Sequence, residues 1–265
     1  TNDAYYIPAS LLYKSFKTMS VLASGAVVRQ VLLSAGAEES QIMAKLQPIA
    51  TDMHALGNPW ISYSVYLNNS FLPGLLQLMI LLVTVFSIGS EMKRATSREW
   101  LRTADDSIII AITGKLIPQT IIFFSMGLLY LSLLYGYLHF PMHNSIWHMI
   151  FAMFLLVVAS QSFAVIIMCF APSLRIGLSV GGLVGVLSLS IAGFSFPVPA
   201  MYLPFQAISY VLPVRHYFLI YVDQALNGIP LYYSRVHYVA LILFAVASTP
   251  LLPRLKKALM RQVYV

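Results

Sequence analysis

Four long stretches of this chain carry no charged residue, and this limits the folds open to it more than any other feature. They are Phe71 to Ser90, Leu116 to Met142, Met149 to Pro172 and Ile176 to Val214. A helix rising 1.5 Å per residue needs about 20 apolar residues to cross about 30 Å of hydrocarbon. Each stretch is long enough, and Val236 to Leu252 is a shorter fifth candidate. We therefore expect an all-α membrane protein, a bundle with five visible transmembrane helices.

The composition agrees with this expectation. Of the 265 residues, 59% are hydrophobic and 9% are charged, whereas soluble domains carry roughly 25% charged residues. A chain this poor in charge cannot cover a water-soluble surface. The single cysteine, Cys169, excludes a disulfide framework and a Cys-based metal site, and we interpret it as a small packing residue.

The N-terminal part is mixed in polarity. Thr18 to Val28 is uncharged, but Lys17 and Arg29 bracket it at a length too short for a crossing, so we predict a soluble or surface helix there. Helix-like runs extend from Ser10 to Ser34 and from Glu38 to Leu56. We expect residues 1–69 to be the C-terminal remnant of an extracytoplasmic domain and residues 70–265 to form the transmembrane domain. The sequence begins with Thr, and we expect it to start inside a longer protein.

The positive charges indicate an orientation. Two segments that lie on the same side of the membrane hold most of them, namely Lys93, Arg94, Arg98 and Arg102 after the first crossing and Arg254, Lys256, Lys257 and Arg261 after the last. The opposite loops hold only Arg215 and Arg235. Because cytoplasmic loops are enriched in Lys and Arg, we predict a cytoplasmic C-terminus. The net charge of +7 then indicates topology first, attraction to anionic lipid second and nucleic-acid binding a distant third, and we expect no nucleic-acid partner.

Glu91 to Arg102 is the densest charge cluster, and we predict an interfacial helix on the cytoplasmic side there. Asp105, Asp106 and Ser107 are expected to cap the next helix, whose membrane crossing should begin near Gly114 and Lys115.

The fourth crossing carries glycines at four-residue spacing, which lets another helix approach closely, so we assign a packing role to Gly177, Gly181 and Gly185. This crossing should end near Phe196, because prolines interrupt the apolar run at Pro197, Pro199, Pro204 and Pro213. We expect a re-entrant pair of short helices that dips into the outer leaflet and emerges near Arg215 and His216.

Most catalytic and metal chemistry lacks its residues. Gly114 and Lys115 are not part of a phosphate-binding loop, so this chain is not expected to hydrolyse ATP. His139, His143 and His148 cluster in an outer loop, but Pro141 interrupts them and we predict no metal site. Asp223 is the only carboxylate after Asp106, and any contact with Arg215 should be a solvated one at the outer surface. The uncharged crossings also disfavour an ion-coupled carrier.

The chain from Asn58 onward resembles the membrane subunits of type-2 ATP-binding cassette exporters, particularly bacterial ones with a large extracytoplasmic domain. Members have an E-x-E-x-G-T-x-x-x-L stretch after their second crossing, and Glu91, Lys93, Thr96 and Leu101 occupy similar places here. The Gly-Lys that opens their third crossing is similar to Gly114-Lys115. Their outer re-entrant hairpin is similar to the segment from Gly193 through Pro213 to Asn227-Gly228. Ala95 departs from the usual Gly, and Thr103-Ala104 from a small-Pro pair.

The resemblance implies six crossings in the intact subunit, a homo- or heterodimer, and a bacterial inner-membrane location. It implies a cytoplasmic ATPase subunit that binds ATP and Mg, no cofactor on this chain, and in some relatives a periplasmic adaptor. The implied coupling residues are Glu91, Lys93, Arg94, Thr96, Glu99, Trp100 and Leu101. Two alternatives are a non-transporting membrane scaffold or sensor, and an ion-coupled carrier.

Overall fold

The computed structural model describes residues 6–36, 63–194 and 196–261. The chain forms two compact units, Thr1–Tyr63 and Ser64–Val265, each taken by itself below. Helices and their connections make up the described residues, with no β-strand among them, so the predicted all-α class is confirmed. The predicted run from Glu38 to Leu56 lies outside the described residues.

The first unit contains one long helix, α1 (Tyr6–Ser34), of 29 residues. Its part Leu11–Ser34 is long and apolar enough to cross a membrane, so the sequence-based estimate that this segment is too short was wrong. The error came from treating Lys17 and Arg29 as boundaries, although both lie within the helix. The helix stops at Gly36, whose φ of +81° is the left-handed conformation that glycine favours after a helix.

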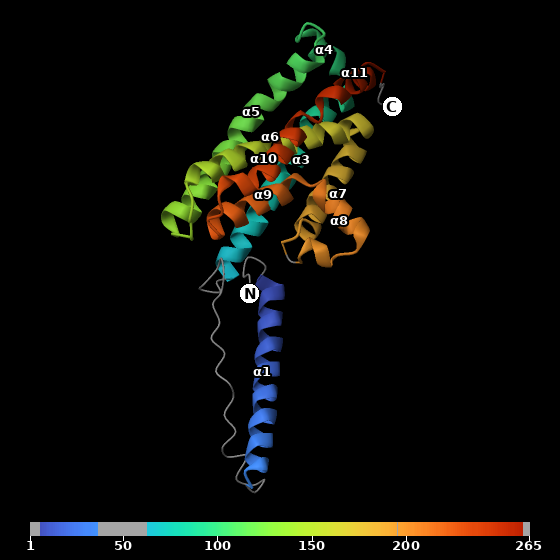
Figure 1. Cartoon of the computed structure of the whole chain (residues 1–265). Coiled ribbons are helices and arrows are strands. Elements are labelled where there is room, and N and C mark those ends of the chain that lie inside the picture. Colours follow the sequence, from blue (N-terminus) through green and yellow to red (C-terminus); the bar gives the residue numbers. More distant parts are fainter. Residues whose placement is uncertain (1–5, 37–62, 195, 262–265) are drawn as a thin grey trace. The chain divides into compact units, whose positions relative to one another are not determined.

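The second unit contains the five predicted crossings as helices that exceed or shift the predicted bounds (Figure 1). They are α3 (Tyr63–Lys93), α5 (Ile108–Leu131), α6 (Ile146–Phe170), α7 (Leu174–Ile191) and α10 (Leu231–Val246). With α1, the described chain has six helical segments long and apolar enough to span a membrane, and the last of them runs from Leu231 to Arg261, beyond the end of α10. α5 begins at Ile108 rather than near Gly114, and it continues as a π-helix over Ser132–Tyr137. Lys115 is therefore inside a helix, and the crossings are not free of charged side chains.

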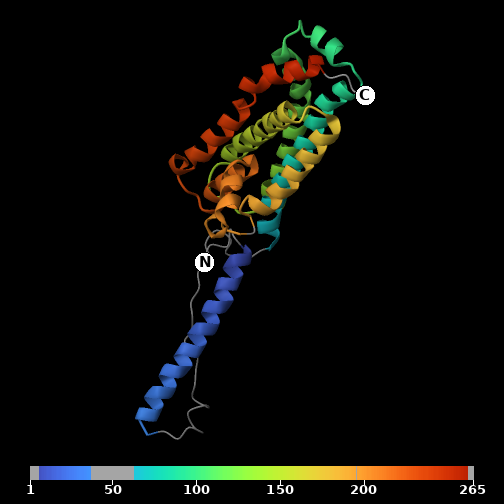
Figure 2. The same cartoon turned by 90° about the vertical axis from the view of Figure 1, so that its right-hand side faces the viewer.

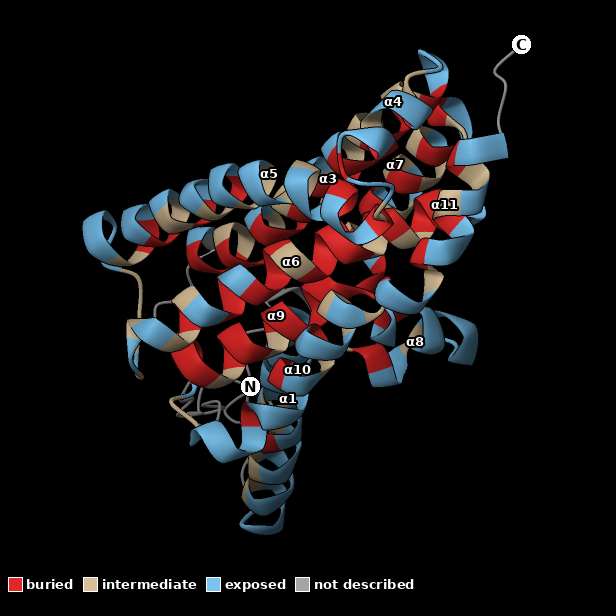
Figure 3. Cartoon of the chain, turned by 90° about the horizontal axis from the view of Figure 1, so that it is seen from above, coloured by how far each residue is buried: buried red, intermediate tan, exposed pale blue. Residues whose placement is uncertain are grey.

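Helix α6 lies at the centre of the second unit, and most of its side chains are buried (Figure 3). Amide and hydroxyl side chains link the helices around it, which in lipid is a main source of helix association. Thr120 of α5 donates to Gln161 of α6 at 2.8 Å. Gln77 of α3 donates to Ser188 of α7 at 3.0 Å and accepts from the Val214 backbone N–H at 2.9 Å. These bonds fix the relative positions of the helices without any charge.

The glycine stripe of α7 faces α3. Gly177, Gly181 and Gly185 are all buried. A Cβ atom on Gly185 would lie 3.1 Å from Cβ and 3.2 Å from Cα of Leu78, and one on Gly177 would lie 2.9 Å from Val85. At Gly185 the backbone of α3 is thus close enough that a side chain would require it to give way, whereas at Gly177 the nearest atoms that a side chain would meet belong to side chains.

Short helices connect α7 to α10. α7 ends at Ile191, earlier than the predicted Phe196, and Gly193 then turns the chain with φ +96°. The 3₁₀ turn η3 (Val198–Ala200), α8 (Leu203–Tyr210), α9 (Pro213–Tyr221) and the π-helix η4 (Val222–Leu226) follow. Pro199, Pro204 and Pro213 occupy the first turns of η3, α8 and α9, where no N–H is needed, while Phe196 and Pro197 precede η3.

The segment after Pro213 does not emerge as predicted, because Arg215 and His216 are buried in α9. Arg215 donates to the Ala192 carbonyl at 3.1 Å, and its guanidinium lies 4.7 Å from the centre of the Tyr210 ring. Asp223 instead accepts from Ser234 at 3.0 Å. The predicted solvated contact between Arg215 and Asp223 was therefore wrong.

Candidate functional site

The predicted interfacial helix over Glu91 to Arg102 is two helices separated by a tight turn. α3 continues to Lys93, and α4 (Ser97–Arg102) has only six residues. Between them Ala95 has φ 58°, a left-handed conformation, and the Thr96 N–H donates to the Glu91 carbonyl at 3.0 Å. An alanine makes this left-handed turn at the cost of backbone strain.

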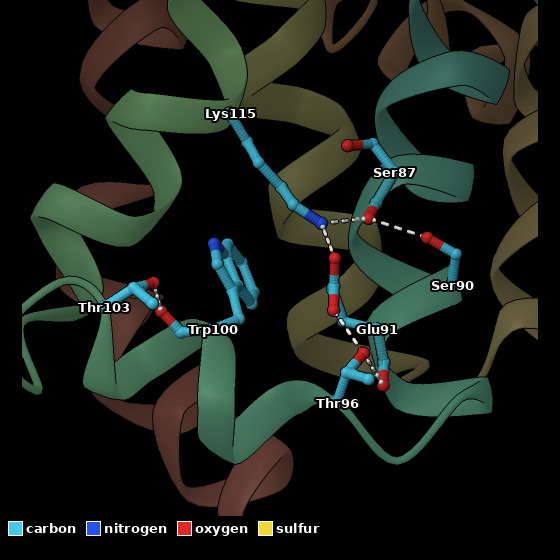
Figure 4. Close-up of polar contacts among 7 residues, drawn as sticks. All are labelled: Ser87, Ser90, Glu91, Thr96, Trp100, Thr103 and Lys115. Carbon is cyan, nitrogen blue, oxygen red and sulfur yellow. Dashed lines mark hydrogen bonds and ion pairs between the residues drawn. The ribbon is translucent and has the colours of Figure 1, made fainter.

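A polar cluster joins the end of α3, the start of α4 and the second turn of α5 (Figure 4). Lys115 Nζ lies 2.6 Å from Glu91 Oε1 and donates to the Ser87 carbonyl at 2.7 Å. The other Glu91 oxygen accepts from the Thr96 hydroxyl. The Lys115 ammonium also lies 4.4 Å from the centre of the Trp100 ring. One lysine thus holds α3, α4 and α5 together through an ion pair, a carbonyl and an aromatic face.

Below this cluster α4 rests on an apolar core. Leu101 is fully buried and Met92 almost so, and they share one cluster with Leu255 and Leu259. After α4, Asp105 and Asp106 both have positive φ, and the Asp106 N–H donates to the Leu101 carbonyl at 2.9 Å. Ser107 precedes α5 at the N-cap position but makes no side-chain cap hydrogen bond, so the predicted cap is absent there.

The predicted coupling residues therefore divide into two sets. Glu91, Thr96, Trp100 and Leu101 make the internal contacts that position α4. The other predicted residues, Lys93, Arg94 and Glu99, are exposed charged side chains on the outside of the same segment, as are Arg98 and Arg102, which were not among the predicted coupling residues. The exposed set forms a mainly basic surface on α4 and the turn before it, and the internal set fixes the position of α4.

The other sequence-predicted residues lie elsewhere. The glycine stripe packs on α3, and Phe196 to Pro213 belong to the connection after α7, away from the end of the bundle that carries α4 (Figures 1 and 2). His143 contacts the Ala225 carbonyl at 2.9 Å, and no group of three or more metal-ligating side chains occurs in the described part of the chain.

Comparison with known families identifies the kind of protein. Residues 1–252 match the sequence profile of a family described as "ABC-2 family transporter protein". The chain belongs to this family. It is thus an ABC-2 type permease, the membrane-embedded and non-catalytic component of an ABC transporter, whose ATPase is a partner. No curated protein and no solved structure gives a significant match.

Sequence reasoning missed how this permease holds its α4 segment. The Gly114-Lys115 pair was noted only as the start of a crossing, whereas Lys115 is the partner of Glu91. A lysine within an apolar helix needs a counter-ion, so the pairing was open to prediction. The C-terminal helix α11 (Leu252–Arg261) was also missed, although Leu252, Leu255 and Leu259 have the spacing of one helix face.

Proposed function

We propose that this permease is the membrane subunit of an ATP-driven exporter and that α4 is the element on which a separate ATPase subunit acts. The observation that carries the proposal is that residues 91–106 contain two kinds of side chain, some in internal contacts and others exposed and charged. Exposed charges lie on a short helix that Glu91, Lys115 and Leu101 hold firmly to three other elements. A surface helix that transmits force needs an exposed face that contacts the partner and internal contacts that fix the helix to the rest of the protein.

The distribution of basic side chains between the two ends of the bundle supports an orientation of the permease in the membrane. α4 and α11 are neighbours, and both expose basic side chains, whereas Arg215 and Arg235 belong to the other end. Under the positive-inside rule α4, α11 and the C-terminus would face the cytoplasm of a bacterial inner membrane, where ATP is available. Binding of ATP and Mg by the partner would close the ATPase subunits and push on α4, switching the permease between inward- and outward-facing states.

A dimer is part of the proposal, with a second permease subunit of the same or a different sequence. One chain of this size has a single α4 segment, and two such segments would receive the two ATPase subunits. A periplasmic adaptor would complete the export path where the cargo has to cross two membranes.

Co-purification tests the proposal. The tagged chain, extracted from its native membrane in mild detergent, should carry an ATPase subunit. Glu99→Lys, which alters an exposed charge and no described internal contact, and Arg94→Glu, which alters an exposed charge that also acts on Glu91, should release that subunit. Arg235→Glu reverses a positive charge at the other end of the bundle and is the matched control. Purified wild-type protein without any ATPase would refute the proposed function.

A further inference from the structure

The C-terminal helix α11 and the α4 segment hold each other reciprocally. Lys256 Nζ of α11 donates to the Asp106 carbonyl at 2.5 Å, and Arg98 Nη2 of α4 donates to the Met260 carbonyl at 3.3 Å. The Met260 carbonyl belongs to the last turn of α11, where backbone oxygens have no partner within the helix. Each segment thus donates a hydrogen bond from a charged side chain to a backbone carbonyl of the other.

An apolar seam reinforces these two bonds. Leu252, Leu255 and Leu259 of α11 are buried in the same cluster as Leu101 and Ala104. A helix lying on a lipid surface places its apolar face among the acyl chains. In α11 that face is already covered by protein, so its apolar side chains are committed to the α4 segment and the adjoining crossings rather than to lipid.

α11 is also joined closely to the last crossing. Only Ala247, Ser248 and the 3₁₀ turn η5 (Thr249–Leu251) separate it from α10. This link is fixed to α6, because the Ser248 N–H donates to the Ser162 hydroxyl at 3.1 Å and Cys169 Sγ lies 3.5 Å from the Leu251 carbonyl. A displacement of α11 would therefore act on both α10 and α6 (Figure 2).

We propose that α11 is a positioning element for α4, so that the two move as one body under the ATPase and carry the adjoining end of α10 with them. The proposal rests on the function proposed above. In this proposal Lys256 and Leu255 help to transmit the movement of α4 into the bundle without contacting the ATPase themselves. It also gives α4 a second path into the bundle, beside the Lys115 cluster.

The test uses the full chain in complex with its ATPase in proteoliposomes. A reporter, Tyr202→Cys, stands on the exposed start of α8, while the native Cys169 is buried and stays in place, and labelling of the reporter by a maleimide is compared with and without ATP. Lys256→Met and Leu255→Ala should reduce the ATP-dependent change in labelling rate at least about fivefold while the ATPase stays bound. Lys257→Met, an exposed neighbour, should leave the change intact, and the volume-conserving Leu255→Met should restore it.

A cross-link provides the opposite arm, which does not depend on a destabilised variant. Asp106→Cys and Lys256→Cys joined as a disulfide by mild oxidation, which leaves the distant reporter thiol free for the maleimide, should retain the ATP-dependent change, because the two segments move together. Loss of the change on cross-linking, a wild-type response in Lys256→Met and Leu255→Ala, or release of the ATPase by these variants would each overturn the inference. A wild-type complex with no response to ATP would refute the proposed function itself, which separates the two failures.

Discussion

Replacing Lys115 with Met should detach α4 from α3 and α5 while keeping the aliphatic part of the side chain. The Lys115 and Glu91 side chains are 20% and 24% exposed, so the pair lies between a surface ion pair and a buried one. Surface pairs contribute about 0–1 kcal/mol, and removing one partner of a buried pair costs about 3–5 kcal/mol. The contact with the Trp100 ring adds about 0.5–2 kcal/mol. Since these terms share one ammonium group, we expect a total loss of about 2–3 kcal/mol.

Thermal unfolding of the purified protein, followed by tryptophan fluorescence, measures this loss. For a chain of this length the shift in Tm should be roughly 4–12 °C. Lys93→Met is the matched control, because Lys93 is exposed and its removal should change stability by less than about 0.5 kcal/mol. A double-mutant cycle with Glu91→Gln should show coupling well above about 0.5 kcal/mol, since the two groups share one bond.

Two results would contradict this reasoning. The first is a Lys115→Met variant no less stable than Lys93→Met. The second is strict additivity of Lys115→Met and Glu91→Gln, which would mean that the pair does not act as a unit. Either would show that the α4 segment is held by its apolar contacts alone.

Three further changes follow from single positions. Ala95→Gly should stabilise by about 0.5–1 kcal/mol because glycine adopts φ 58° without strain, whereas Ala95→Val should destabilise; equal Tm values would contradict this. Gly185→Ala should cost about 1–3 kcal/mol against the Leu78 backbone, while Gly182→Ala, with only Leu82 at 3.8 Å, should be tolerated. Burial lowers the pKa of His216 below 6.5, an effect that the bond to Tyr210 opposes and His237 and Arg215 add to. The fold therefore favours neutral His216, so Tm should fall as pH drops from about 6.5 through that lower pKa, and His216→Gln should reduce this fall, with the remainder due to His237, whose pKa burial also lowers.

The crossings were predictable because the length of an apolar segment needs no knowledge of tertiary contacts. Their ends were not, because a charged residue ends an apolar segment only where nothing neutralises it. Lys115 has Glu91 as a partner 24 positions away in the sequence, so α5 and α3 both extend past the uncharged stretches. In α1 the helix likewise runs through Lys17 and Arg29.

The composition of the α4 segment was predictable, but the roles of its residues were not. The sequence identifies Glu91 and Glu99 as equivalent acidic residues of one charged segment. The left-handed turn at Ala95 changes the direction of the chain between them, which places Glu91 against Lys115 and leaves Glu99 in solvent. A one-dimensional charge pattern cannot show such a turn when the residue that makes it is an alanine.

This division changes what an uncoupling mutation means. A substitution at Glu91 would remove its bonds to Lys115 and Thr96 and so loosen α4. Lost coupling in such a variant would therefore reflect weakened internal contacts of α4 rather than a lost contact with the partner. Glu99 makes no described internal contact, and the exposed Arg94 acts on Glu91 only through its charge, so a defect at these positions with unchanged Tm would locate the partner's surface. The two classes separate by stability: internal variants lose Tm and coupling together, and exposed ones lose coupling alone. If the Arg94 and Glu99 variants also lost several degrees of Tm, α4 would have to be held in place by contacts other than those of Lys115.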